Sequence, residues 1–238
     1  MSDLICVWID DRSVEVPAAA SILEAAKAAG VEIPTLCYHK DLLPDGSCRF
    51  CTVEVQTAGG KKLVTACTEQ VLPGMRIATR SPQVVETRRF LLSLLLEKHK
   101  KSCFSCEKAE DCIHRKRPFC NYDNSCYTCP KVEECKLRAY CIEYGVTSGA
   151  CGDLKKEEPV NDQSQAFLHD PNRCILCRRC VRACREALGD ERMIAVDGRG
   201  SAARITLRLR PEANCGACMK CVEVCPTGAL VRKEEIKE

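Results

Sequence analysis

The chain has 238 residues, of which 22 are cysteine, and its 36 Lys and Arg against 33 Asp and Glu give a formal charge of +3. One Trp and five Phe are few for several apolar cores, so metal ligation is expected to contribute to folding. The opening MSDLICVWIDDRS is not that of a secretory signal, and no apolar run reaches the length of a membrane span. We therefore expect a cytoplasmic protein without membrane insertion, whose clustered cysteines stay reduced and bind metal.

The small excess of basic residues does not indicate a nucleic-acid partner. A cysteine that binds metal does so as a thiolate, so the charge of the metal-loaded chain includes every ligand and every metal core. Several clusters with four thiolates each make the loaded chain net negative. The Lys and Arg side chains are therefore interpreted as a counterweight to cluster charge, and no nucleic-acid binding is expected.

Residues 1–80 predict an α+β unit of the β-grasp type. Ser21 and Glu24 form a capping box at the start of a helix, and Gly30 stands where a helix is expected to end. A hairpin is expected around Asp10 and Asp11. The segments with strand composition are 4–9, 13–16, 52–57 and 62–66.

Residues 81–155 predict a long helix followed by a metal-folded segment. Ser81 is the expected cap and Pro82 the first helical residue, and the helix ends in the basic run 98–101. Residues 102–151 are dense in cysteine and have little strand pattern, and the polar stretch 155–165 is interpreted as a linker. The apolar face of the helix is predicted to comprise Val84, Val85, Arg88, Leu91, Leu92 and Leu95.

Residues 156–238 contain two similar runs, CILCRRCVRAC from Cys174 and CGACMKCVEVCP from Cys215. This is the C-x2-C-x2-C-x3-C spacing of bacterial two-cluster ferredoxins, in which the fourth cysteine binds the other cluster. Arg185 replaces the Pro of that pattern in the first run, which leaves the ligands unchanged. Zinc ligands usually come as separated pairs, so triplets favour cubes. We predict one 4Fe–4S cluster at Cys174, Cys177, Cys180 and Cys225, and another at Cys184, Cys215, Cys218 and Cys221.

The first unit has a cysteine set of its own, in Cys37, Cys48, Cys51 and Cys67. Plant-type 2Fe–2S proteins have C-x4-C-x2-C followed by a distant fourth cysteine, so this set differs at the first gap and keeps the second. A 2Fe–2S cluster is predicted here, and a four-cysteine zinc site is the alternative on spacing alone.

A histidine joins the next set, which is His99, Cys103, Cys106 and Cys112. A single histidine at a helix end is more often a solvated partner of the helix dipole. The three cysteines that follow it favour a ligand role instead. A 4Fe–4S cluster with one imidazole ligand is less negative, and less negative clusters tend to have higher potentials.

Cys126, Cys129 and Cys135 repeat the spacing of that triplet, but Tyr122 stands where His99 would be. The fourth ligand of an extra 4Fe–4S cluster would be Cys120, Cys141 or Cys151, and Cys120 is preferred because it lies just upstream. The alternatives are an inert duplicate or zinc. Cys6, in a predicted strand, is expected to be part of the core.

The order of these motifs resembles the N-terminal region of the large iron–sulfur subunit of complex I and of iron-only hydrogenases. The similarity is carried by ASILEAAKAAGVEIPTLCYH, GSCRFCTVEV and NRCILCRRCVRAC. The chain is similar above all to the stand-alone diaphorase small subunit of NAD(P)-linked hydrogenases, formate dehydrogenases and electron-bifurcating complexes. This resemblance implies one 2Fe–2S and three to four 4Fe–4S clusters. It implies as partners a flavoprotein subunit that binds NAD(P)(H) and a hydrogenase or formate dehydrogenase catalytic subunit, with ferredoxin as a further candidate.

These 238 residues contain no G-x-G-x-x-G fingerprint, P-loop or nucleophile elbow, and no hydrogenase or molybdopterin domain. No catalytic residues and no cofactor sites beyond the clusters are therefore predicted. The expected function is electron transfer between the flavoprotein and the catalytic subunit. The alternatives are a respiratory complex I subunit, a freestanding polyferredoxin carrier and a zinc-binding scaffold.

Overall fold

The computed structural model describes residues 4–57, 59–97, 99, 129, 131, 134–147, 149, 158–210 and 215–235. The chain divides into two compact units, residues 1–91 and 92–238. Within the described residues, none of the helices combines the length and the apolar character needed to cross a membrane.

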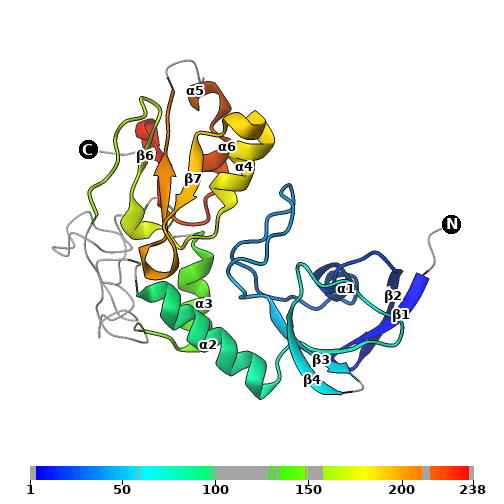
Figure 1. The fold of residues 1–238 in the computed structure, drawn as a ribbon. Helices are drawn as coiled ribbons and strands as arrows, with labels where there is room; N and C mark the ends of the chain where they lie inside the picture. The colour runs from blue at the N-terminus through cyan, green and yellow to red at the C-terminus, as the bar shows by residue number, and fades with distance from the viewer. Residues whose placement is uncertain are drawn as a thin grey trace. The chain divides into compact units, whose positions relative to one another are not determined.

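A five-stranded mixed sheet, helix α1 and the first part of α2 (Pro82–Leu96) form the described part of the first unit (Figure 1). The strand order of the sheet is β2-β1-β5-β3-β4, and β1 and β5 are the parallel pair. A parallel pair needs a long crossover connection, and here α1, β3 and β4 lie between the two strands in the chain. The elements are β1 (Leu4–Ile9), β2 (Arg12–Pro17), α1 (Ile22–Ala28), β3 (Thr52–Thr57), β4 (Gly60–Thr65) and β5 (Arg76–Ala78).

The local signals in the first unit are confirmed. Strands β1 and β2 form the predicted hairpin, with Ile9 opposite Arg12 and the left-handed Asp10 in the turn. Both hydrogen bonds of the capping box between Ser21 and Glu24 are present at the start of α1. The core combines alternate residues of β1 and β3, one residue of β5 and the inner face of α1, namely Val7, Ile9, Val53, Val55, Ile77, Ile22, Ala25 and Ala26.

The prediction that Cys6 belongs to this core is wrong. Val7 and Ile9 are fully buried, whereas Cys6 is only partly buried. Successive strand residues point to opposite faces, so Cys6 lies on the face away from the core.

Helix α2 (Pro82–Leu96) begins as predicted, because the Ser81 hydroxyl accepts a hydrogen bond from the Val84 N–H at 3.4 Å. Its fully buried residues follow a strict four-residue spacing at Val84, Arg88, Leu92 and Leu96. The predicted face is therefore partly right, since Val85, Leu91 and Leu95 are only half-buried.

Helices and two small sheets form the described part of the second unit (Figure 1). Strand β6 (Phe167–His169) pairs with β9 (Leu230–Arg232), and β7 (Ile194–Asp197) pairs with β8 (Arg204–Leu207), both antiparallel. These strands and α3 have no counterpart in the sequence prediction. The helices are α3 (Lys136–Tyr144), α4 (Arg179–Leu188), α5 (Cys215–Cys218) and α6 (Lys220–Glu223).

The core of this unit lies among the cysteine runs. It combines Phe167 and Leu230 from the first sheet with Ile194 and Ile205 from the second, and with Val222 of α6. The paired strands hold the two cysteine runs together, because β6 precedes the first run and β9 follows the second. The stretch 158–165 is bound to this unit, since the Asn172 amide donates to the Glu158 carbonyl at 2.8 Å.

Candidate metal centres

The four predicted ligand cysteines of the first unit lie in loops around β3 and β4. Cys48 and Cys51 flank a loop in which Arg49 adopts a left-handed conformation with φ of 57°. Such a conformation is uncommon for a residue with a Cβ and turns backbone N–H groups toward one side of the loop. Cys37, Cys51 and Cys67 are almost fully buried, and Cys48 is partly buried.

The sulfur atoms of this set interact in two pairs. The backbone N–H groups of Cys37 and Phe50 donate to the Cys48 Sγ at 3.3 and 3.4 Å. The Cys37 thiol and these N–H groups together lower the pKa of Cys48 to about 7. In the other pair, the hydrogen bond between Cys51 and Cys67 and burial raise the pKa of Cys51, and the same hydrogen bond lowers the pKa of Cys67. Cys37 and Cys48 also act electrostatically on the second pair, so all four predicted ligands face one region.

The structure brings the first predicted cube set of the second unit together in one cavity. Burial and repulsion by the other three thiols of the set raise the pKa of Cys180 well above its ordinary value. Cys174, Cys177, Cys180 and Cys225 line this cavity, which we call cavity A, with His169, Ile175, Arg178, Ile205, Thr227, Ala229 and Leu230.

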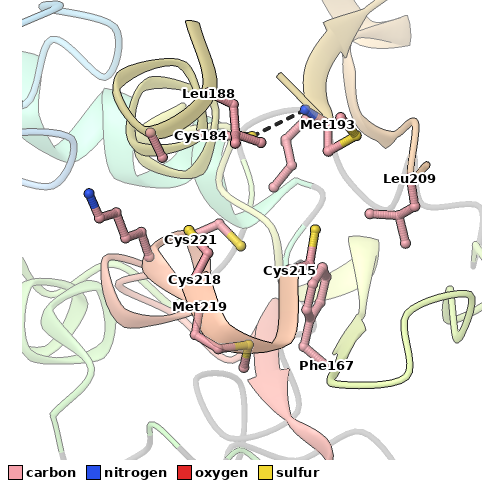
Figure 2. Close-up of a pocket in the computed structure, with 12 residues that line it drawn as sticks. Phe167, Cys184, Leu188, Met193, Leu209, Cys215, Cys218, Met219 and Cys221 are labelled. Atoms are coloured by element: carbon pink, nitrogen blue, oxygen red, sulfur yellow. Dashed lines mark hydrogen bonds between the residues drawn. The ribbon is translucent and has the colours of Figure 1, made fainter. Parts of the chain in front are cut away.

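The second predicted cube set lines another cavity, which we call cavity B (Figure 2). The Cys184 Sγ accepts a hydrogen bond from the backbone N–H of Met193 at 3.2 Å. Apolar side chains dominate the remaining wall. The lining consists of Cys184, Cys215, Cys218 and Cys221 with Phe167, Ala187, Leu188, Met193, Ile194, Leu209, Met219 and Lys220.

Left-handed residues recur in the cysteine loops of both cavities. Leu176, Arg178 and Met219 have φ values of 52°, 58° and 46°. Strained conformations of this kind cluster at functional sites, and alternating backbone conformations form the concave N–H nests found at iron–sulfur centres. At cavity A the Leu176 N–H donates to the Cys174 Sγ at 3.4 Å, as such a nest requires.

The donor chemistry of both cavities fits iron–sulfur clusters. Burial raises the pKa values of Cys174 and Cys221 to about 12, so as free thiols these groups resist ionisation. A metal core compensates several buried thiolates, and a coordinating thiol is deprotonated. Among the described residues, no three His, Cys, Asp or Glu side chains are spaced to enclose a single metal ion. The cysteines instead surround cavities in which sulfur atoms are the main polar groups.

The Arg that replaces Pro after the first run has a local explanation. Cys184 and Arg185 lie inside α4, and the Gly189 N–H donates to the Arg185 carbonyl. Proline here would remove a helix hydrogen bond and clash with the preceding turn. Cys225 follows the end of α6, so Pro226 meets no such constraint.

The histidine-containing set is only partly within the described residues. His99 is 6% exposed and follows the end of α2. Its predicted partners Cys103, Cys106 and Cys112 lie outside the described residues, as do Cys120, Cys126 and Cys151 of the extra site.

Two members of the extra triplet are described, Cys129 and Cys135. Cys135 is the residue before α3, and Cys141 within α3 is 1% exposed. Burial raises the pKa of Cys135, and Cys129 acts electrostatically in the same direction. Cys135 acts on Cys141 in turn, whose pKa burial raises to about 12. The described residues thus place Cys141 near Cys135, whereas Cys120, which the sequence analysis preferred, lies outside them.

Some residues near these centres were not predicted. Arg179 of α4 is buried, and its Nη1 donates to the Val224 carbonyl at 3.4 Å, one residue before Cys225. His169 of β6 lines cavity A. His169 belongs to no motif, and Arg179 occupies a variable position of the first cysteine run. Only the pairing of β6 with β9 brings His169 to cavity A, and only the approach of α4 to α6 brings Arg179 to the second run.

Comparison with known proteins assigns the N-terminal and the C-terminal part of the chain to domain families. Residues 2–82 match the family described as a 2Fe-2S iron-sulfur cluster binding domain. Residues 165–231 match the ferredoxin-like domain of NADH-quinone oxidoreductase subunit 3. Both matches are iron–sulfur domains and coincide with the described cysteine sets.

Three relatives match almost the whole chain. It is 35% identical over 230 residues to an NADH-quinone oxidoreductase subunit of Rhizobium meliloti, covering 96% of this chain and 24% of that protein. It is 31% identical over 230 residues to NADPH-Fe(3+) oxidoreductase subunit alpha of Geobacter sulfurreducens, covering 97% and 24%. It is 31% identical over 243 residues to NADP-reducing hydrogenase subunit HndD of Solidesulfovibrio fructosivorans, covering 99% and 37%. The chain thus spans between 24% and 37% of the length of these relatives.

The fold also matches a solved structure. A chain in the crystal structure of NAD+-reducing NiFe hydrogenase in the H2-reduced state superposes with a TM-score of 0.72 at 27% identity. The match covers 96% of this chain and 87% of that one. The two ends of the chain thus belong to the 2Fe-2S iron-sulfur cluster binding domain family and to the ferredoxin-like domain family of NADH-quinone oxidoreductase subunit 3, and the chain is similar over nearly its whole length to subunits of NAD(P)-linked hydrogenases and complex I-type oxidoreductases.

Proposed function

We propose that the chain relays single electrons between a flavoprotein that binds NAD(P)(H) and a catalytic subunit that converts hydrogen or formate. The observation that carries this proposal is the pair of four-cysteine cavities in one compact unit, each lined by three cysteines of one run and one of the other. Such crossing of ligands holds two centres in a fixed order within one fold, which a relay requires. The NAD(P)-linked names of the relatives support the same direction.

The residues divide between the clusters as follows. Cys37, Cys48, Cys51 and Cys67 would hold a 2Fe–2S cluster, and cavities A and B would each hold a 4Fe–4S cluster. When bound, these groups accept and release one electron at a time. The protein's own part is to supply thiolates, to donate backbone N–H groups to sulfur as at Cys48, Cys174 and Cys184, and to exclude water.

We place His99 with Cys103, Cys106 and Cys112 as a further 4Fe–4S site, on the sequence spacing and on the burial of His99. By resemblance, this site and the 2Fe–2S site face the flavoprotein, and the paired cubes lead toward the catalytic subunit. Electron bifurcation with ferredoxin belongs to the same proposal, because bifurcating complexes are among the proteins that the sequence resembles.

An extra 4Fe–4S cluster at Cys126, Cys129 and Cys135 completes the proposed relay. The mutual influence of Cys129, Cys135 and Cys141 supports Cys141 as the fourth ligand, with Cys120 and Cys151 as the other candidates. Replacing Cys129 by Ser, and separately Cys141 by Ser, tests this choice. The variant that lacks a true ligand should lose about four irons per chain. Unchanged iron in both variants would contradict the site.

The function is tested by anaerobic purification with iron, zinc and acid-labile sulfide measured together. About 18 irons per chain with matching sulfide supports one 2Fe–2S and four 4Fe–4S clusters, and about 14 removes the extra cluster while keeping the relay. Zinc without sulfide overturns the proposal. Native complexes isolated through this chain should then reduce NAD(P) with hydrogen or formate, whereas NADH-dependent quinone reduction would favour a respiratory complex I subunit, the activity named in its Rhizobium meliloti relative.

A further inference from the structure

The two cavities differ in what strand β6 presents to them. Residues two apart in a strand lie on the same face, and here Phe167 lines cavity B while His169 lines cavity A. Phe167 is 1% exposed and His169 is 4% exposed. One strand therefore contributes an apolar ring to one centre and an imidazole to the other.

The imidazole of His169 has a buried nitrogen without a hydrogen-bond partner. Its Nε2 atom finds neither donor nor acceptor among the described residues. The backbone N–H and carbonyl of His169 are both engaged with the backbone of Asn161, at 3.0 and 2.8 Å, so the backbone that carries the ring is fixed on both sides. Leaving such a buried polar group unpaired is unfavourable, and an unpaired group in a native fold points to a partner such as a bound ion or cluster.

The other polar side chains that line cavity A are already engaged or reach solvent. The Thr227 hydroxyl donates to the Arg173 carbonyl at 2.8 Å, and Arg178 is exposed to solvent. Desolvation lowers the pKa of His169 against the opposing effect of Asp170 and Glu158, so the neutral imidazole, with one N–H, is the form at pH 7. The cavity that this N–H shares is lined by four cysteine sulfur atoms, which can accept its hydrogen bond.

We propose that His169 donates its Nε2 hydrogen bond to a sulfur of the cluster held by Cys174, Cys177, Cys180 and Cys225, and thereby makes it the higher-potential cube of the pair. This inference rests on the proposed function, because it assumes that cavity A holds a cube. Reduction adds one electron to the cube and moves no proton. A hydrogen bond to sulfur stabilises the more negative reduced form, so it raises the potential. Cavity B has Phe167 in the corresponding place and gains no such donor.

The test uses the full chain, loaded with iron and sulfide, and EPR-monitored redox titration. His169→Leu removes the donor and keeps the bulk, His169→Gln keeps a donor, and Phe167→Leu is the matched change at cavity B. In His169→Leu one cube should be about tenfold harder to reduce, which is about 59 mV for one electron. His169→Gln should restore part of this shift, and Phe167→Leu should leave that cube unchanged. Unaltered potentials in loaded His169→Leu, or the same fall in Phe167→Leu, overturn the inference.

Loss of the cube in His169→Leu would leave that comparison without a signal, so a second measurement uses the unmodified chain. With 15N-labelled histidine, pulsed EPR of the reduced cubes should detect a weak coupling, distinct from the strong coupling of a coordinated imidazole. Absence of any weak coupling overturns the inference. Low iron and sulfide in the unmodified chain would instead contradict the proposed relay, so the two failures are distinguishable.

Discussion

A Cβ atom placed on Gly228 would lie 2.5 Å from the Sγ of Cys129. Real Cβ atoms do not approach other atoms so closely, so the position of Cys129 requires glycine at 228. Gly228 follows Cys225 and Thr227 and precedes Ala229, and all three of these neighbours line cavity A. A cysteine of the extra triplet therefore packs directly against the loop that lines cavity A.

Replacing Gly228 by Ala tests whether Cys129 is a fixed ligand. A free cysteine would rotate away from the added methyl group at small cost, whereas a coordinated Cys129 cannot move, and the clash is then expected to cost about 1–3 kcal/mol. The variant should lose about four irons per chain, measured with sulfide after anaerobic purification.

Gly59 provides the matched control for this substitution. A Cβ at Gly59 meets nothing within 4 Å, and its backbone conformation is an ordinary one. Gly59→Ala should keep all of its iron. Full loading of Gly228→Ala would contradict a rigid ligand at Cys129 and would favour an inert duplicate.

Arg88 is predicted to stabilise the 2Fe–2S unit from within its core. Its side chain is fully buried on α2, and Nη2 donates to the Thr52 carbonyl at 2.8 Å, one residue after Cys51. Arg88→Met keeps the aliphatic bulk but leaves that carbonyl without this donor, which is expected to lower the free energy of unfolding by about 1–3 kcal/mol. The change in the free energy of unfolding is measured by denaturant titration, with the visible circular dichroism of the cluster as the signal. Arg89→Met, at the exposed neighbouring position, should be close to neutral, and equal effects of both changes would contradict the role of Arg88.

The sequence predicts best those features whose signals are local. The Asp10 turn, the capping box of Ser21 and Glu24, and the Ser81-Pro82 helix start each depend on a few neighbouring residues, and each is confirmed. Strand β5 has three residues and pairs with β1 and β3, so no alternating pattern in its own segment predicts it.

The candidate sites, too, are predicted from the sequence only where their signal is local. Cysteine spacing alone predicts which cysteines share cavities A and B, since the ligands of each cluster follow a repeated motif. The place of His169 beside cavity A depends on the pairing of β6 with β9, which lie far apart in the sequence of the second unit. A single histidine carries no spacing signal, so the sequence does not point to it.

Cys48 is predicted to be an unusually reactive thiol in the cluster-free protein. Its pKa of about 7 lies below its ordinary value of 9.0, because the Cys37 thiol and backbone N–H groups stabilise the thiolate. A lowered folded pKa means that the thiolate contributes stability fully above about pH 9, and that this contribution is lost as the pH falls through 7. Alkylation of the apoprotein by iodoacetamide, followed by peptide mass spectrometry, should give a midpoint near pH 7 at Cys48. Cys215, partly exposed but with its pKa raised by burial, should remain largely unmodified at pH 8, and a midpoint near 9 at Cys48 would contradict the prediction.

Arg179 is predicted to hold Cys225 in place for the first cube. The guanidinium of this buried residue connects α4, which carries Cys180, to the Val224 carbonyl just before Cys225. Arg179→Met removes that connection. The expected loss of about 1–2 kcal/mol of stabilisation corresponds to roughly a tenfold change in the equilibrium between held and released iron.

The measurement for Arg179 is iron release to a chelator under anaerobic conditions. The variant should release the iron of one cube about tenfold faster, while the remaining clusters keep the rates of the unmodified chain. Arg185→Met, an exposed change on the same helix, serves as the control and should release iron as the unmodified chain does. Faster release from every cluster in Arg179→Met would mean that the whole unit is destabilised. Only the selective loss of one cube supports Arg179 as the residue that positions the ligand donated from the second cysteine run to the first.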